Sequence, residues 1–161
     1  MAADNQQERL DPRWVVGFVD GEGCFHVSIN RHPRMPIGWQ VLPEFRIVQH
    51  ERDESVLRNL QQFFQAGKVV VNHGARKELR IRRLNELQQV VSFFSRYSLR
   101  TKKKRDYEIF KEILELMSQK KHLTIYGLIK IANLCWAMNR KVKPRFLESS
   151  ETVRQKSLQS D

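Results

Sequence analysis

Cysteine and long apolar runs are both scarce in this sequence. Its 161 residues include two cysteines, Cys24 and Cys135, which have neither the density of a disulfide scaffold nor the spacing of a zinc site. Two unpatterned thiols are typical of a reducing compartment. No apolar run is long enough to span a bilayer, and residues 1–13 lack the basic and apolar regions of a secretory signal. We therefore expect an intracellular protein that is not secreted and has no membrane partner. An organellar address stays open, since a protein encoded in an organelle needs no transit peptide.

Acidic residues are outnumbered by basic ones. There are 18 aspartates and glutamates against 29 lysines and arginines, which gives a formal net charge of +11. Such an excess predicts a polyanionic partner, and nucleic acid is the commonest one. A membrane surface and a role in solubility alone are the alternatives that charge leaves open. Hydrophobic residues make up 40% of the chain, which is enough for an ordinary globular core.

The length and the polarity of the two ends predict one folded domain with a tail on either side. Residues 1–12 are polar and end in an Asp-Pro pair, and residues 148–161 are almost entirely polar. We therefore expect flexible tails at 1–12 and 148–161. A chain of this size is long enough for one core but short for two full domains, so residues 13–147 are expected to form a single domain.

Within residues 13–147 the hydrophobic period alternates between that of a helix and that of a strand. A short apolar helix through residues 14–19 precedes two strands at about 24–30 and 40–47, joined by a basic loop with two prolines. Asp53 is expected to cap a helix that Gly67 stops, and a second hairpin follows at 68–72 and 78–82, with Val69 and Val71 facing the core. Helices are expected at 84–94, 104–117 and 126–138. This order predicts an α+β fold, with helices covering one face of a four-stranded sheet and the other face open.

The first helix ends in a short motif rich in glycine and acid. Residues 15–23, VVGFVDGEG, resemble the LAGLIDADG signature of homing endonucleases. Gly17 and Gly21 are four residues apart, so both lie on one helical face, and two copies of the helix can approach closely there. Trp14 and Phe18 would fill the surroundings of this contact.

The match departs from the signature at a few positions. Val15 and Val16 replace Leu-Ala, Phe18 replaces Leu, and Glu22 replaces the final aspartate, which exchanges one carboxylate for another. The alternative is that Asp20 and Glu22 merely cap or solvate a turn beside glycines. The resemblance favours a functional role for Glu22 and a structural role for Asp20.

The resemblance implies a homodimer of the single-motif type, because the chain contains one signature and no second copy. The implied fold is αββαββα with an antiparallel saddle-shaped sheet and additional C-terminal helices. Trp14, Gly17, Phe18 and Gly21 would form the dimer interface, and the two Glu22 side chains would lie near the twofold axis. The implied cofactor is Mg²⁺, held by Glu22 and Gly21, and Mn²⁺ or Ca²⁺ could occupy the same sites. Hard oxygen ligands suit such ions.

Two further residues match family positions near the reacting phosphate. The resemblance implies that Gln49 orders water around the metal and that Lys102 lies close to the scissile phosphate, which are sensible roles for a neutral amide and for a cation. Gln49 is equally compatible with an ordinary strand end, and Lys102 with a solvated basic run. Asp53 stands where a relative type has arginine, and whether the neighbouring Arg52 replaces it stays open.

The open face of the sheet is polar and basic, as a surface that contacts base edges and phosphates would be. Glu44 and Glu78 are the exposed acids expected on it. The residues expected to bind DNA are His26, Ser28, Asn30, Arg31, Arg34, Gln40, Glu44, Arg46, Lys68, Val70, Asn72, Arg76, Arg80, Arg82, Lys103, Arg140 and Lys141.

These features predict an intron-encoded, metal-dependent DNA endonuclease that cuts a long pseudo-palindromic duplex site and has no small-molecule substrate. The alternative is a protein of the same fold that binds nucleic acid without cutting, such as a maturase that helps its host intron to splice. A plastid or a mitochondrion is the expected compartment if the intron is organellar.

Overall fold

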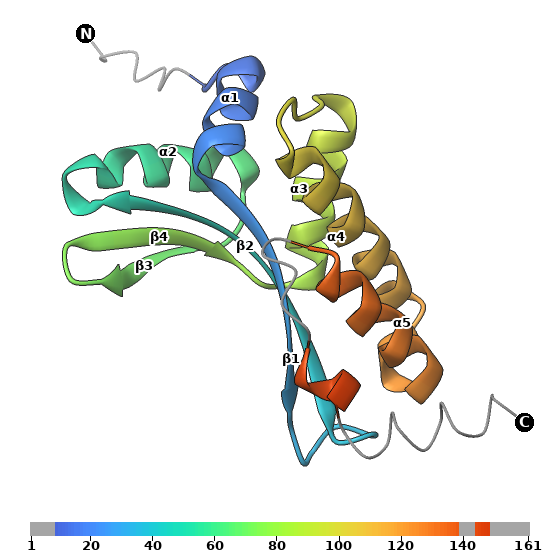
Figure 1. Cartoon of the computed structure of the whole chain (residues 1–161). Coiled ribbons are helices and arrows are strands. Elements are labelled where there is room, and N and C mark those ends of the chain that lie inside the picture. The colour runs from blue at the N-terminus through green and yellow to red at the C-terminus, as the bar shows by residue number, and fades with distance from the viewer. Residues whose placement is uncertain (1–8, 139–143, 149–161) are drawn as a thin grey trace, which may run out of the picture. The chain divides into compact units, whose positions relative to one another are not determined.

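The computed structural model describes residues 9–138 and 144–148, which fall into two compact units. Residues 9–23 and 46–99 belong to the first unit, and residues 24–45, 100–138 and 144–148 to the second. Four strands form one antiparallel sheet in the order β1-β2-β4-β3, so the predicted α+β fold is confirmed (Figure 1). The elements are α1 (Pro12–Glu22), β1 (Gly23–Arg31), β2 (Trp39–His50), η1 (Glu51–Asp53), α2 (Glu54–Phe64), β3 (Lys68–His73), β4 (Arg76–Ile81), α3 (Leu84–Arg96), α4 (Lys103–Ser118), η2 (Lys121–Leu123), α5 (Ile125–Trp136) and η3 (Arg145–Glu148).

Helix α1 of the first unit has well-defined ends. Asp11 is its N-cap and accepts a hydrogen bond from the backbone N–H of Arg13 at 2.7 Å, and Pro12 occupies the first turn, where its missing N–H costs nothing. At the other end, the backbone N–H of Gly23 donates to the Val19 carbonyl. An added Cβ at Gly23 would lie 2.7 Å from Cγ1 of Val19, so this close turn requires glycine.

Helix α2 of the first unit buries Leu57, Leu60 and Phe64 on one face. The prediction that the Asp53 side chain caps it is wrong. Asp53 holds the N-cap position, but its side chain makes no capping hydrogen bond, because Asp53 is the last residue of the 3-10 turn η1 and its backbone lies outside the extended region that capping needs. The chain leaves the helix through Gln65, which adopts the left-handed conformation at φ 53°.

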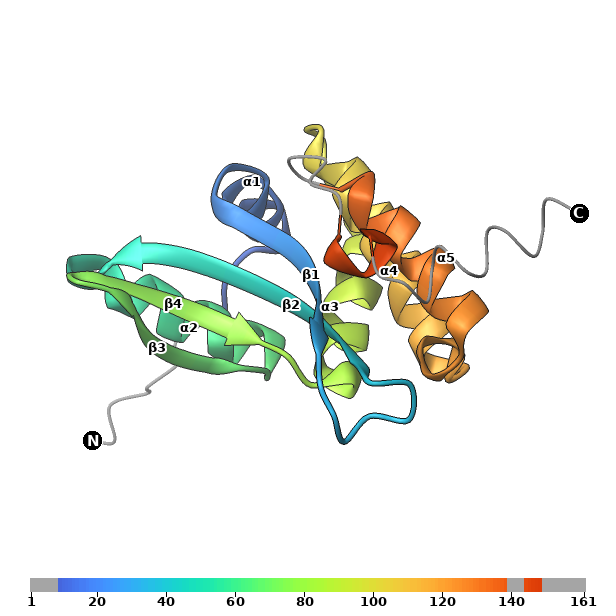
Figure 2. The same ribbon diagram turned by 60° about the horizontal axis from the view of Figure 1, so that its bottom comes forward.

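The β3–β4 hairpin pairs antiparallel, and α2 covers one of its faces (Figure 2). Leu79 and Ile81 are buried, as their period predicts. The prediction that Val71 faces the core is wrong, since this residue is 63% exposed. Burial decreases along β3 towards the turn, and the register shifts between Val71 and His73. Alternation identifies the two faces of a strand but does not reveal where the strand leaves the core.

The second unit is organised around Phe25 of β1. Its ring centroid lies 5.0 Å from that of Phe45, 5.3 Å from that of Phe110 and 5.7 Å from that of Tyr107. Helices α4 and α5 lie side by side in this unit (Figure 1).

Within the described ranges, no helix combines the length and the apolar character needed to cross a membrane.

Candidate functional site

One face of α1 is open in this chain. A Cβ atom added at Gly17 or at Gly21 would meet nothing within 4 Å. Trp14 is 43% exposed and stacks on Phe18, with ring centroids 4.9 Å apart and planes inclined by 16°. The opposite side of the helix buries Val15 and Val19. Intrachain packing therefore gives no reason for glycine at positions 17 and 21, although two large rings flank the same face.

The two acids of the motif lie in different surroundings. Glu22 is the last residue of α1 and is exposed, whereas Asp20 is half-buried and already has an interaction partner. The carbonyl of Gly21 belongs to the last turn of the helix, where carbonyls have no partner within the helix. The helix end thus presents a carboxylate and a carbonyl to solvent, both of them hard oxygen donors.

A single copy of the chain does not supply an acid-rich metal cage. Among residues 9–138 and 144–148, no group of three or more histidines, cysteines, aspartates or glutamates is arranged to hold a metal ion. Thiolate chemistry finds no support at Cys135 either, because burial raises the pKa of its thiol to about 12 and keeps it protonated. Glu22 is therefore not a member of such a group within the described part of the chain.

The other two predicted catalytic residues fall in different units. Gln49 lies near the end of β2 in the first unit, as Glu22 does at the end of α1, and it is half-buried. Lys102 is exposed at the N-cap of α4 in the second unit. The helix start is capped instead by Thr101, whose hydroxyl accepts from the backbone N–H of Lys103 at 3.3 Å. The neighbouring cations oppose the helix dipole, which is a cost that a bound anion would offset.

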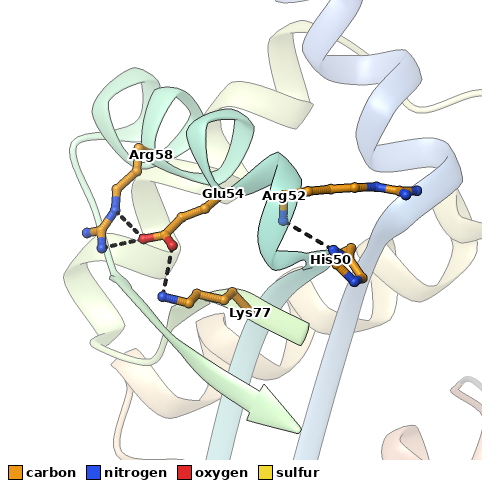
Figure 3. Close-up of polar contacts among 5 residues, drawn as sticks. All are labelled: His50, Arg52, Glu54, Arg58 and Lys77. Atoms are coloured by element: carbon orange, nitrogen blue, oxygen red, sulfur yellow. Dashed lines mark hydrogen bonds and ion pairs between the residues drawn. The ribbon is translucent and has the colours of Figure 1, made fainter. Parts of the chain in front are cut away.

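Arg52 and Asp53 lie side by side in η1 and interact with each other. The Nε atom of Arg52 lies 3.7 Å from Oδ2 of Asp53. The backbone N–H of Arg52 donates to Nδ1 of His50 at 3.2 Å (Figure 3). The Arg52 side chain is 78% exposed. Arg52 is therefore a solvent-facing cation paired with its own neighbour.

In the first unit, the predicted DNA-binding residues all lie on strands β2, β3 and β4 or directly next to them. Lys68, Asn72, Arg76 and Arg82 are exposed, and Arg46, Val70 and Arg80 are half-buried. The expectation that Glu78 is an exposed acid is wrong, since this residue has 0% exposure. It accepts a hydrogen bond from Nδ2 of Asn72 at 2.9 Å and pairs with Arg80. Pairing with Arg80 on the same strand and with the Asn72 amide on the neighbouring strand accompanies the burial of the carboxylate.

In the second unit, the predicted DNA-binding residues lie on β1, β2, the loop between them and the start of α4. Asn30, Arg31 and Arg34 are exposed, and His26, Ser28, Gln40 and Lys103 are half-buried. The amide of Asn30 donates to Oγ of Ser28 at 3.2 Å, and the Arg31 guanidinium lies 4.8 Å from the centroid of the Trp39 ring. Arg140 and Lys141 lie outside the described residues.

The expectation that Glu44 is an exposed acid in this unit is also wrong. Its exposure is 5%, and it has an interaction partner. A buried carboxylate is costly unless it is paired, so an acid withdrawn from solvent on β2 requires such a partner.

Comparison with known proteins matches this chain to one family. The family model described as LAGLIDADG endonuclease matches residues 15–114. A probable intron-encoded endonuclease of Neurospora crassa is 35% identical over 144 residues, which cover 85% of this chain and 32% of the relative. The chain spans about a third or less of the length of the relatives it matches in Neurospora crassa and Podospora anserina.

Solved structures give the same result. The homing endonuclease I-TnaI has 50% sequence identity and a TM-score of 0.84, and the match covers 89% of this chain and 98% of that one. I-SmaMI, a LAGLIDADG homing endonuclease bound to cleaved DNA, has 35% identity and a TM-score of 0.83, over 86% of this chain and 47% of that one. A second I-SmaMI structure contains an uncleaved DNA target in the presence of calcium ions.

Proposed function

Because the chain belongs to the LAGLIDADG endonuclease family, we propose that it acts as a homodimer that binds a long duplex site and hydrolyses both DNA strands with a metal ion. One observation carries this proposal. The open glycine face of α1 ends in the exposed carboxylate of Glu22, so a contact between two copies of this face would bring two such carboxylates to a common centre. An intron as the source of the gene agrees with the name of the Neurospora crassa relative.

The dimer explains features of α1 that a monomer leaves without purpose. Glycine at positions 17 and 21 lets two helix backbones approach more closely than larger side chains would. The Trp14 and Phe18 rings, which are stacked at the edge of this face, would be covered by the partner. Large aromatic side chains at the centre of an interface provide much of its binding energy.

The donor set at the helix end fits a hard divalent cation such as Mg²⁺. Glu22 and the Gly21 carbonyl provide oxygen ligands, and the second Glu22 of a dimer together with phosphate oxygens would complete a set that one chain lacks. A bound Mg²⁺ would supply an activated water and stabilise the leaving oxygen. Calcium in the I-SmaMI complex with uncleaved DNA supports a divalent ion of this class.

Gln49 and Lys102 would complete the chemistry. The amide of Gln49 both donates and accepts hydrogen bonds, so it can orient the attacking water without taking its proton. The ammonium of Lys102 can stabilise negative charge that develops on the phosphate. Lys102 is exposed, and no side-chain cap or ion pair of this residue occurs in the described part of the chain.

DNA as the partner is supported by charge and by the polar sheet face. A net charge of +11 favours a polyanion, and the exposed or half-buried amides and arginines of β3 and β4 have the donors that pair with base edges. The DNA in the I-SmaMI structures supports the same partner. If each copy follows the major groove for one turn, the site is about 20 base pairs long and roughly palindromic.

Selection of cleaved sites from a randomised duplex library, with Mg²⁺ present, tests the proposal. We expect the cleaved products to share one pseudo-palindromic sequence and to disappear when a chelator is added in excess. Cleavage that persists in the chelator would contradict the metal, and a site without symmetry would contradict the homodimer. Selective binding without any cut would favour the maturase alternative.

A further inference from the structure

The sheet face of the first unit contains a buried acid that the proposed function does not use. The side chain of Glu78 on β4 is 1% exposed, and the proposed DNA surface includes Arg80, two residues further along β4, and Val70, which pairs with Glu78 across the strands. A buried carboxylate is costly unless its charge is paired and its oxygens accept hydrogen bonds. Both conditions are met here by side chains that we propose to contact DNA.

Each oxygen of Glu78 has its own partner. Oε2 accepts a hydrogen bond from Nδ2 of Asn72 on β3 at 2.9 Å. Oε1 accepts from Nε of Arg80, and Nη2 of Arg80 pairs with the same oxygen. One acid thus holds two side chains that we propose to contact bases, Asn72 on β3 and Arg80 on β4. The Arg80 side chain remains 33% exposed, so its outer edge is accessible.

We infer that Glu78 is a positioning residue for base recognition, which orients the Arg80 guanidinium towards a guanine and sets the orientation of the Asn72 amide. This inference rests on the proposed function. A guanidinium has five N–H donors. Nε and one N–H of Nη2 face Glu78, which leaves Nη1 and the second N–H of Nη2 on the outer edge. Those two nitrogens match the O6 and N7 acceptors that guanine presents in the major groove.

The same acid determines the orientation of Asn72. An ionised carboxylate only accepts hydrogen bonds, so the amide nitrogen of Asn72 must face it. One N–H and the amide oxygen are then left for the DNA, which is the pair that recognises adenine. Asn72 and Arg80 are therefore already oriented before DNA binds, and this lowers the entropy cost of each base contact.

An acid on helix α2, which contacts the opposite face of β4, provides a matched control. Glu54 of α2 accepts from Nη2 of Arg58 at 2.8 Å and lies 2.8 Å from Nζ of Lys77 on β4 (Figure 3). Lys77 and Glu78 are neighbours, so their side chains point to opposite faces of the sheet. Glu54 therefore has two cationic partners, as a buried acid would, but it joins helix to strand and faces away from the proposed DNA surface.

Base preference of wild type, Glu78→Gln, Arg80→Ala and Glu54→Gln on one randomised library tests the inference. Arg80→Ala should lose roughly fivefold to a hundredfold of guanine preference at one position in each half-site. Glu78→Gln should lose at least about threefold at that same position, because the arginine is no longer held. Its affinity for non-specific DNA should not fall, since the charge of Arg80 is no longer offset. Glu54→Gln should keep the wild-type preference.

Two outcomes would overturn the inference and leave the proposed function intact. One is a Glu78→Gln profile equal to that of wild type, and the other is a uniform loss at all positions that Glu54→Gln also shows. A wild-type protein with no base preference at all would overturn the proposed function instead, and the inference with it.

A second measurement decides the matter if Glu78→Gln does not fold. In the free wild-type protein, the Nε–H proton of Arg80 should exchange slowly with water, and NMR should show a resolved signal for it. Arg80→Ala assigns that signal by its disappearance. Fast exchange of this proton would show that Glu78 does not hold the arginine, and the inference would be wrong.

Discussion

Helix α1 in the first unit and helix α5 in the second both contain glycine, which is less favourable than alanine by about 1 kcal/mol in a helix interior. In α1 the space around Gly17 and Gly21 is empty to 4 Å. In α5 an added Cβ at Gly127 would lie 1.9 Å from the carbonyl oxygen of Lys121. Gly17 and Gly21 therefore destabilise α1 without improving any contact within the chain. Gly127, in contrast, is required because no larger residue fits beside Lys121.

The surroundings of Gly127 show how an internally satisfied helix start is built. The Thr124 hydroxyl accepts from the backbone N–H of Gly127 at 3.1 Å and donates to the Lys121 carbonyl at 2.9 Å. One side chain thereby ties η2 to the first turn of α5, and the carbonyl leaves no room for a methyl group. The contrast separates a glycine that its own chain requires from two glycines that their own chain leaves open, and the proposed dimer contact lies at the open pair.

The largest effect should come from the carboxylate at the end of the open α1 face. Glu22→Gln keeps the shape of the side chain but loses the charge that holds a metal ion, so cleavage should fall by about a thousandfold or more. DNA affinity and thermal stability should stay at wild-type values, because Glu22 is exposed. Single-turnover cleavage and binding assays on the selected site measure this. Glu115→Gln, at an exposed position of α4, is the control, and full activity of Glu22→Gln would remove Glu22 from the reaction.

The next largest effect should come from filling the glycine face itself. Gly17→Leu adds a side chain where the chain has room for it, so the monomer should keep its melting temperature. The dimer dissociation constant should rise by about a hundredfold or more, because two such side chains would separate the helices. Sedimentation equilibrium measures the mass and calorimetry the stability. Ser92→Leu, at an exposed position of α3, is the control. An unchanged mass and unchanged cleavage would show that α1 is not the interface.

The periodicity of hydrophobic residues was sufficient to predict the order and type of the α-helices and strands, because one face of each of these elements is buried. It did not predict which side chains meet across strands. Glu78 lies on the polar face, as its position predicts, yet it is buried because Asn72 and Arg80 close over it. Alternation specifies the face of a residue, whereas exposure depends on the lengths and charges of its neighbours on the same strand and on the adjacent one.

The candidate site could be predicted only in part for a similar reason. The motif alone identifies the glycine face and Glu22, since both depend on spacing within one helix. Capping was missed at two helix starts, where His50 and Thr101 accept the backbone N–H bonds. These residues are ordinary in the sequence, and only the path of the backbone turns their side chains towards those N–H groups.

A smaller effect, on stability alone, is expected when Gly127 of α5 and Gly17 of α1 are each replaced by alanine. Gly127→Ala should lower the free energy of unfolding by about 2 kcal/mol or more, since η2 must move away from the new methyl group. At protein concentrations below the dimer dissociation constant, Gly17→Ala should raise the free energy of unfolding of the monomer by up to about 1 kcal/mol through helix propensity. Urea unfolding of the two variants gives both values. Equal effects of the two substitutions would remove the distinction between the two kinds of glycine.

The smallest effect should appear when pH is lowered, and it should be confined to the η2–α5 region. His122 lies in η2, its Nδ1 atom is buried with no hydrogen-bond partner among the described residues, and burial lowers the pKa of its ring below the ordinary value. The folded state therefore binds the proton less readily than the unfolded state. As pH falls, the unfolded chain takes up this proton first, near its ordinary pKa of about 6.5, so stability that is present above that value is lost below it. His122→Gln cannot titrate and should lose less stability than wild type between pH 7.5 and pH 5.5. The difference between the two unfolding free energies, measured across that range, cancels the other histidines. The loss should be small because the ring is half-exposed, and a wild type that gained stability relative to the variant on acidification would contradict this sign.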